Sequence, residues 1–220
     1  MHVFMRTQKI VKEIHRLLLP TLAAKGFDGY ESKDNYNIYY TRLMKGGWHR
    51  VIIGLNGRPG ELIPIFGLQV RIDRIIDLLY PVDFIGHGDQ SVVIGNMVSR
   101  YSNGQEFSWI FKLEDVHKPV QYLIDFLERE GFGWLERYTS VDDIDKELNR
   151  PDRPRDLFIS ETNRWYKGLV AAVLNKNPEA AYWHGYYRNC VVAYNSFSPV
   201  MLNKYDELTE MLVREHGLRI

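Results

Sequence analysis

The sequence predicts an α+β protein: an N-terminal helix packed on an antiparallel β-meander of about five strands, followed by a C-terminal helical part. Three observations support this class. Apolar residues recur at helical spacing near the start of the chain. Apolar and polar residues then alternate across much of residues 37–113, as in strands with one packed face. Helical spacing returns from about residue 117 and continues to the end.

The segment 7–27 is predicted to form an amphipathic helix. Its apolar stripe consists of Ile10, Ile14, Leu17, Leu18 and Leu22. Thr7 is expected to cap the start of the helix, and Pro20 is expected to kink it. Gly26 followed by Phe27 fits a left-handed helix end with an apolar residue folding back. The same glycine-then-apolar pair predicts two more helix ends, at Gly131–Phe132 and Gly217–Leu218.

The middle of the chain predicts the meander. Residues 35–57 are expected to form two strands joined at Gly46–Gly47. Residues 61–73 supply a third strand, and residues 91–113 supply two more around Asn103–Gly104. In the third strand one side is apolar, with Leu68, Val70 and Ile72. Between the third and fourth strands, residues 74–80 are expected to form a short helix or turn that ends before Pro81.

The second half is predicted to be helical. Helices are expected at residues 117–132, 140–149, 160–176, 178–194 and 203–217. Ser140 is the expected cap of the second of these, with Asp143 three residues later. Residues 150–156, which are rich in proline and charge, are interpreted as an extended linker. This organisation divides the chain into an α+β domain at residues 1–134 and a helical region at residues 135–220, which could also pack as one unit.

Composition narrows the classes of partner. The chain has 28 basic and 28 acidic side chains, with 14 basic and 10 acidic in residues 1–113. A nucleic-acid-binding protein concentrates positive charge, so this balance disfavours nucleic acid. No apolar run approaches the length of a membrane span, and the first twenty residues lack a signal-peptide pattern. A single cysteine, Cys190, fits a reducing compartment. A cytoplasmic protein with no membrane partner is therefore expected.

The common catalytic templates are absent from the sequence, so no catalytic residue, metal ligand set or cofactor is predicted. The loop "GHGD" pairs His87 with Asp89, a combination that could orient a general base, but glycine-rich turns look the same. The acidic run "DDID", residues 142–145, resembles a metal cluster. Acids in a first helical turn are expected in any case, because they complement the helix dipole.

The strand "QVRID" carries a row of polar side chains, Gln69, Arg71 and Asp73. An arginine held on a strand between hydrogen-bonding neighbours could bind a carboxylate or another anion. The alternative is a solvated face on which Arg71 and Asp73 form a pair. This row is the best single candidate for a site on the sheet.

The stretch "AYWHGYYRNCVVAY", residues 181–194, contains five aromatic rings, which do not share one helical face. One stripe consists of Ala180, His184, Tyr187, Val191 and Tyr194, whereas Tyr182, Tyr186 and Asn189 fall on another. The stretch is therefore expected to pack chiefly between neighbouring helices, with some rings exposed. The alternative is a ligand groove, lined by Trp183, Tyr186 and Arg188.

The first half of the chain resembles a bacterial family known as a domain of unknown function. In that family a helix ends in Gly-Phe, a strand with an aromatic-x-Arg element follows, and a later strand carries a glutamine. The matching positions are Gly26, Phe27, Tyr40, Arg42 and Gln69. The resemblance implies a bacterial source and no catalytic residues, and the helical second half has no counterpart in it.

Two functional hypotheses follow. The leading one is a binding or interaction protein without catalytic activity, such as an immunity or accessory protein for one protein partner, or a homodimer. Aromatic residues and arginine, which dominate interface hot spots, motivate it. The alternative is an enzyme that acts on an anionic small substrate in a cleft between sheet and helices. Its candidate residues are Arg71, Asp73, His87 and Asp89.

Overall fold

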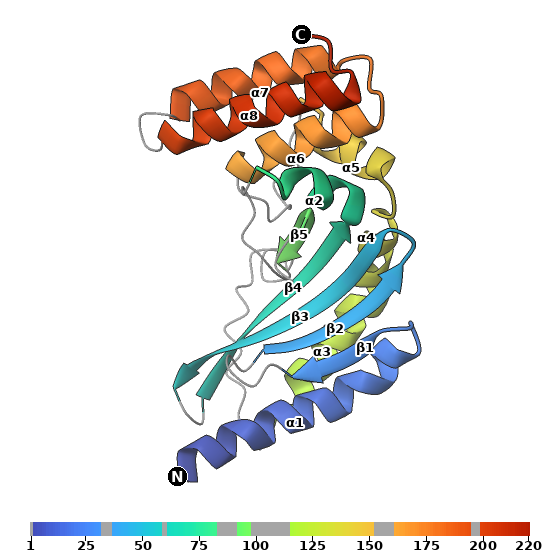
Figure 1. Ribbon diagram of the computed structural model, residues 1–220. Helices are drawn as coiled ribbons and strands as arrows, with labels where there is room; N and C mark the ends of the chain where they lie inside the picture. The colour runs from blue at the N-terminus through green and yellow to red at the C-terminus, as the bar shows by residue number, and fades with distance from the viewer. Residues whose placement is uncertain are drawn as a thin grey trace. The chain divides into compact units, whose positions relative to one another are not determined.

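The computed structural model describes residues 2–31, 37–58, 61–82, 92–97, 115–151, 161–194 and 199–220, and it confirms the α+β class (Figure 1). The chain divides into two compact units. The first comprises residues 1–70 and 95–137, and the second comprises residues 71–94 and 138–220. The break at 137/138 lies three residues from the predicted boundary, and residues 71–94 group with the helical unit.

The sheet has five strands in the order of the sequence: β1 (Asp28–Glu31), β2 (Asn37–Met44), β3 (Gly47–Arg58), β4 (Glu61–Ile72) and β5 (Ile94–Met97). The pairs β1–β2 and β2–β3 are antiparallel, with Ile38 opposite Ile53 and Tyr40 opposite Val51. Gly46 makes the turn between β2 and β3 with a φ of +83°, a conformation that glycine adopts without strain. The predicted antiparallel meander is confirmed.

The membership of the sheet differs in detail from the prediction. β1, directly after the first helix, was not anticipated as a strand. The expected last strand, with Phe107 and Trp109, lies outside the described residues. In β4 the predicted alternation holds, because Leu68, Val70 and Ile72 are all buried.

Helix α1 (His2–Ala23) packs on this sheet through its predicted stripe, and its end is as expected. Gly26 has a φ of +78°, and the backbone N–H of Phe27 donates to the carbonyl of Leu22. The start is different: the helix already runs from His2, so Thr7 lies inside it rather than capping it. No glycine or proline lies between His2 and Thr7 to stop the helix from extending.

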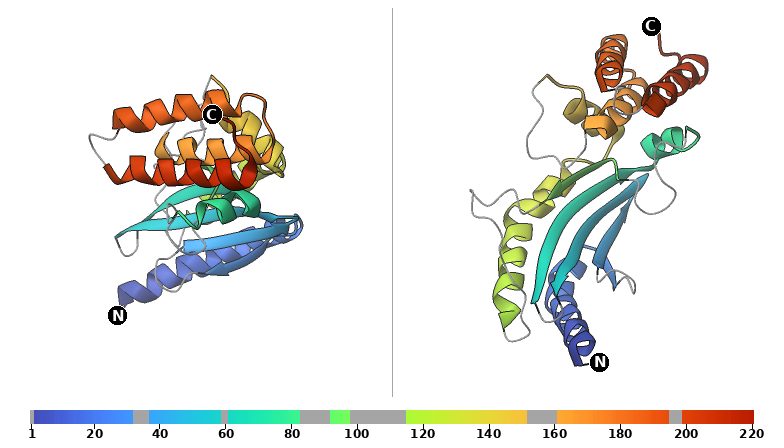
Figure 2. Two further views of the ribbon diagram at one scale, coloured as in Figure 1. Left: turned by 45° about the horizontal axis from the view of Figure 1, so that its top comes forward. Right: turned by 90° about the vertical axis from the view of Figure 1, so that its left-hand side faces the viewer.

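One predicted helix end was wrong. Helix α3 (His117–Phe126) continues through a π-helical turn, η3 (Leu127–Gly131), into α4 (Phe132–Glu136), and Figure 2 shows them running along the sheet. Gly131 has a helical φ of −63°. A Cβ there would lie 3.0 Å from Cδ2 of Leu127, so glycine serves close packing and not chain reversal. The other predicted end is confirmed: Gly217 has a φ of +71° after helix α8 (Pro199–His216).

The second unit is built around one helix, α6 (Glu161–Leu174). It contacts α2 (Asp73–Leu79), α5 (Val141–Leu148), α7 (Ala180–Tyr194) and α8. Every residue from Arg164 to Val173 is buried. The capping box predicted at the start of α5 is present, because Ser140 and Asp143 hydrogen-bond reciprocally. None of the helices in the described ranges has the length and apolar character needed to cross a membrane.

The buried face of α6 includes two cationic side chains, and both donate to backbone carbonyls. Arg164 donates to the carbonyls of Leu148 and Arg150, at 3.0 and 2.8 Å. Lys167 is 5% exposed and donates to the carbonyl of Val92 at 2.5 Å. Burial lowers the pKa of Lys167 to about 8, because a carbonyl replaces hydration water only in part.

Substitution of Lys167 by methionine should change how stability depends on pH. Between pH 8 and about 10.5 the unfolded chain binds this proton and the folded chain does not, so the wild-type free energy of unfolding should rise with pH. Relative to Lys167→Met, the rise should total about 3 kcal/mol. Urea unfolding of both proteins at pH 7 to 10.5 measures it.

The matched control is Lys176→Met, which removes an exposed lysine just after the same helix. Its difference from the wild type gives the baseline for the loss of one exposed lysine at each pH. A Lys167→Met difference that follows this baseline would contradict a lowered pKa at Lys167.

Candidate functional site

Helix α7 has two faces of different character. Trp183, Tyr187 and Val191 are buried, whereas Tyr182 is 61% exposed and Tyr186 is 43% exposed. The predicted division of the rings into an inward and an outward set is confirmed for these four rings, but Tyr194, expected on the inward stripe, is 42% exposed. The inward set packs in the second unit, where α7 contacts α6 and α8.

The hydroxyl of Tyr187 determines which side of α7 faces inward. It donates to the carbonyl of Leu148 at 3.0 Å and lies 2.7 Å from Oδ1 of Asn149, both at the end of α5. The ring reaches them past Gly168 of α6, where a Cβ would lie 2.6 Å from the hydroxyl. Burial raises the pKa of Tyr187, so the hydroxyl stays protonated and remains a donor.

A buried carboxylate fixes the start of α7. Asp145 of α5 accepts hydrogen bonds from the side-chain amides of Asn149, Asn175 and Asn177, at 2.6 to 3.1 Å. Asn177 in turn accepts from the backbone N–H of Glu179, just before α7. Three amide donors replace the lost hydration of the carboxylate, and they connect α5 to the segment between α6 and α7.

The neighbouring acids of the "DDID" run have ordinary structural roles. Asp142 pairs with Lys146, whose hydrogen bond lowers the pKa of that carboxyl. Burial of Asp143 acts to raise its pKa, but hydrogen bonds from Ser140 and Thr139 outweigh it and hold the pKa below the usual range. Within the part of the chain that the structure describes, no group of three or more His, Cys, Asp or Glu side chains is placed to hold a metal.

The outward rings of α7 form a contiguous cluster. Tyr182 and Tyr186 are stacked, with centroids 6.4 Å apart and planes 19° apart. The buried indole of Trp183 meets both rings edge-on, with centroids at 5.1 and 5.8 Å. Its Nε1 is buried and has no acceptor in the described ranges. An aromatic surface backed by a buried ring is well supported and presents a large apolar area.

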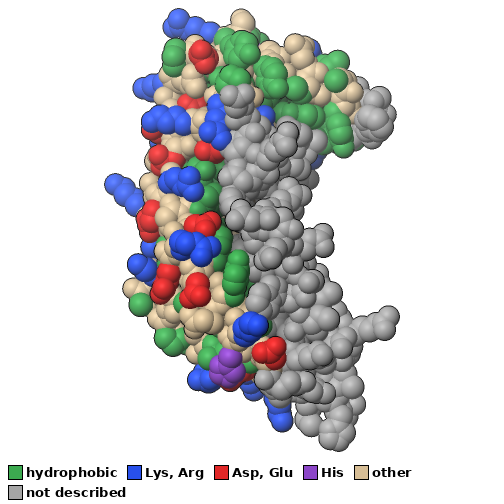
Figure 3. All heavy atoms as spheres, turned by 180° about the vertical axis from the view of Figure 1, so that it is seen from behind, with side chains coloured by type: hydrophobic (Ala, Val, Ile, Leu, Met, Phe, Trp, Pro, Cys, Tyr) green, Lys and Arg blue, Asp and Glu red, His purple; other side chains and the backbone are tan. Residues whose placement is uncertain are grey.

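The surface of α7 around these rings is also uncharged, since Arg188, the exposed cation of this helix, lies outside it and pairs with Asp206 of α8. We call the following residues the tyrosine face: Tyr182, Gly185, Tyr186, Asn189, Val192 and Ala193. In the neighbouring helix α8, by contrast, most exposed residues between 203 and 216 are charged. Figure 3 shows hydrophobic side chains gathered over the C-terminal helices at the top of the view. Depletion of charge with enrichment of aromatic residues is typical of the centre of a protein interface.

Of the predicted groove residues, the structure brings two together and separates the third. Trp183 and Tyr186 are in ring contact. Arg188 instead forms an ion pair with Asp206 of α8, with Nε 3.2 Å from Oδ1. His184 lies near Arg188 on α7, and its pKa is lowered by burial and by the charge of Arg188. Sequence reasoning left Tyr182 out of the candidate site, although its i, i+4 spacing from Tyr186 is the signal that places both rings together.

The polar row on β4 is only partly a strand feature. Gln69 and Arg71 lie on β4, but Asp73 begins helix α2. Nε of Arg71 lies 2.7 Å from Oδ1 of Asp73, which is the pairing that the sequence left open as the alternative. His87 and Asp89 lie outside the described residues.

Three of the residues that carry the family resemblance, Phe27, Tyr40 and Arg42, form a junction in the first unit. The guanidinium of Arg42 lies 5.0 Å from the ring centroid of Phe27, donates to Glu136 of α4 and is 2.8 Å from Nδ1 of His49. Tyr40 stacks on His15 of α1, with centroids 5.6 Å apart. These contacts join the end of α1, the sheet and α4, so their evident role is packing.

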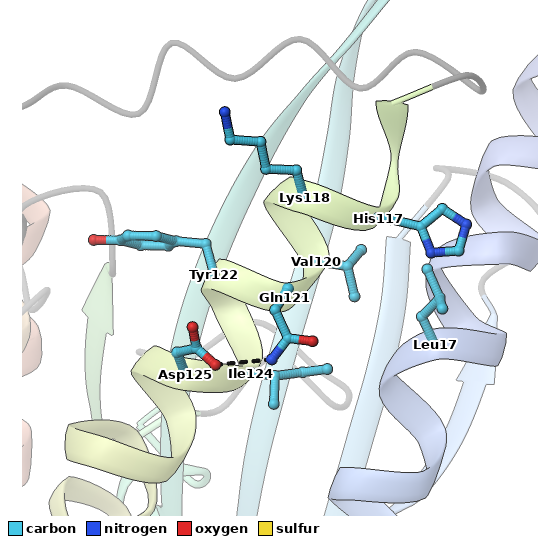
Figure 4. Close-up of a pocket in the computed structure, with 8 residues that line it drawn as sticks. All are labelled: Leu17, His117, Lys118, Val120, Gln121, Tyr122, Ile124 and Asp125. Carbon is cyan, nitrogen blue, oxygen red and sulfur yellow. Dashed lines mark hydrogen bonds between the residues drawn. The ribbon is translucent and has the colours of Figure 1, made fainter.

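A surface hollow of about 550 Å³ lies beside α1 and α3. Figure 4 shows that its side chains do not converge: Lys118 and Tyr122 leave α3 on one side, whereas His117 points toward α1. Gln121 donates to Asp125 across the middle at 2.8 Å. The hollow therefore does not offer a set of polar groups aimed at one ligand atom.

Comparisons with known proteins add no relative: no family model, no curated protein and no solved structure matches the chain.

Substitution of Gly168 by alanine should disturb the seating of Tyr187. The new methyl group would overlap a hydroxyl held by two hydrogen bonds, so the free energy of unfolding should fall by about 2 kcal/mol. The cost should be smaller in a Tyr187→Phe background, which lacks the overlapping oxygen. Urea unfolding of the four proteins of this cycle gives the coupling.

Gly185→Ala provides the control, because a Cβ there meets nothing within 4 Å. That change should stabilise α7 by up to about 1 kcal/mol through helix propensity alone. An equal cost of Gly168→Ala with and without the Tyr187 hydroxyl would show that the clash is with another neighbour, such as Oδ1 of Asn149 at 2.9 Å, and not with the hydroxyl.

Proposed function

We propose that this chain is a protein-interaction module without catalytic activity, which contacts one protein partner through the tyrosine face of α7. The observation that carries the proposal is the stacked, exposed pair Tyr182 and Tyr186 on a helix face without charge. A bacterial cytoplasmic immunity or accessory protein is a role of this kind.

Exposure of this surface is the physical reason for a partner. Large aromatic side chains gain free energy when they leave water, at roughly 25 cal/mol per Å² of apolar area. Tyrosine gives this area with few rotatable bonds, and its hydroxyl can hydrogen-bond to the partner. The gain is not opposed by desolvation of charges, because the tyrosine face has none.

The support beneath the rings also favours association. Trp183 packs against both exposed tyrosines, and Tyr187 holds the helix through its hydroxyl. A surface already held in one arrangement loses little conformational entropy on binding. The tyrosine face is therefore suited to act as a compact hot spot.

The competing enzymatic hypothesis loses support from the sheet. Nε of Arg71 donates to Asp73 at 2.7 Å, so the charge of this arginine is already partly compensated by a carboxylate of the same chain. This makes Arg71 a weaker anion site than a free arginine on a strand would be.

Serine substitutions on the tyrosine face should weaken partner binding and leave the fold intact. Tagged chain should recover one protein from native lysate, and Tyr182→Ser or Tyr186→Ser should reduce the amount recovered. With that protein purified, calorimetry should show the dissociation constant raised about tenfold or more for each variant, as for hot-spot residues.

The control is Val213→Ser, which removes an exposed apolar side chain of α8 outside the tyrosine face. It should bind as the wild type does. Equal binding by wild type and both tyrosine variants would argue against this face as the binding surface, provided that their melting temperatures agree.

A further inference from the structure

The spacing of one line of exposed residues on α7 reads the same in both directions along the helix. Tyr182, Tyr186, Asn189 and Ala193 are exposed and follow one another at spacings of four, three and four. This spacing gives a continuous seam along a helix, of the type that packs against a second helix. The N-terminal half of the seam has large side chains, and the C-terminal half has small ones.

An antiparallel copy of the same helix would complement this seam. With the two-fold axis between residues 187 and 188, Tyr182 of one copy faces Ala193 of the other, and Tyr186 faces Asn189. Each large side chain then meets a small one, which is how facing helices interdigitate. The amide of Asn189 would also lie where the hydroxyl of Tyr186 can hydrogen-bond to it.

The charges beside the seam are consistent with self-association. Two copies of a charged face would repel each other, but no residue of the tyrosine face is charged. The nearest cation, Arg188, is already paired with Asp206 of its own chain. An isologous contact therefore brings no unpaired like charges together.

We propose that the partner seated on the tyrosine face is a second copy of this chain, with the two α7 helices antiparallel and Tyr182 against Ala193. The proposal rests on the proposed function, since it assigns an occupant to the same surface. The contact is isologous, so it closes at two chains and does not propagate into a filament.

The register can be tested with two charged variants of the full chain. Ala193→Glu and Tyr182→Lys each place a charge against an uncharged partner position, so each alone should weaken the dimer at least tenfold in sedimentation velocity. Mixed together, they should form a heterodimer, in which the carboxylate introduced at position 193 of one chain faces the ammonium group introduced at position 182 of the other. In the other contact of that heterodimer, Tyr182 faces Ala193 as in the wild type.

Two controls accompany the mixture. Val213→Glu adds the same charge on α8 and should leave the dimer unchanged. Thermal melting of the two seam variants should match the wild type at concentrations where the wild type is also monomeric, because both positions are exposed and only dimerisation would add stability. A parallel pair of helices would set residue 182 beside residue 182. Mixing would then remove the like-charge repulsion but form no ion pair, so the mixture should show no salt-sensitive gain from an ion pair.

Several results would overturn the proposal. A wild-type chain that stays monomeric at about 100 µM would exclude a dimer with a micromolar dissociation constant. A dimer that survives both seam variants would lie elsewhere, and a mixture that fails to associate would exclude this register. If the chain is monomeric but a different protein binds through Tyr182 and Tyr186, the second copy is refuted and the proposed function stands. If the chain neither dimerises nor binds another protein through this face, both the second copy and the proposed function are refuted.

Discussion

The contact between Gly168 and Tyr187 determines which residues of α7 the protein presents to solvent. Successive residues on a helix are about 100° apart, so fixing one side chain fixes the direction of all the others. The hydroxyl of Tyr187 reaches the end of α5 only because residue 168 has no side chain. Once Tyr187 points inward, Tyr186 and Tyr182 must point away from the core. The exposed aromatic pair is thus a consequence of a buried hydrogen bond.

The second unit combines an apolar core with polar groups that specify its arrangement. Burial along α6 supplies the driving force, but apolar contacts alone would tolerate a rotated or shifted helix. The hydrogen bonds between Asp145 and three asparagine amides do not tolerate such a rotation or shift, because any displacement leaves a buried carboxylate without donors. The cations of α6 act similarly, since Arg164 must reach two carbonyls near residue 150. Such groups add little net stability and make alternative packings costly.

Local sequence patterns predicted the elements well and their long-range partners poorly. Periodicity located the helices, the meander and the two faces of α7. The same glycine-then-apolar signal was right at Gly26 and Gly217 and wrong at Gly131, because there the next turn carries apolar side chains that are buried by continuing the helix. The network around Asp145 joins residues about thirty positions apart, and no local pattern reports such a distance. Arg188 pairs with Asp206 of α8, a contact that local spacing along α7 does not report.

In the proposed function, helix α7 has packing contacts on one side of its backbone and the binding surface on the other. Its inward aromatic side chains are held by packing and by hydrogen bonds to neighbouring helices, whereas its outward tyrosines rest chiefly on Trp183. Changes to the outward seam should therefore alter association with little effect on folding, because they remove few internal contacts. Changes to the inward stripe should lower the stability of the fold. They should affect association only if they rotate the helix. A composition rich in tyrosine supports both roles, because the ring can be buried while the hydroxyl meets either a carbonyl inside the protein or a partner outside it.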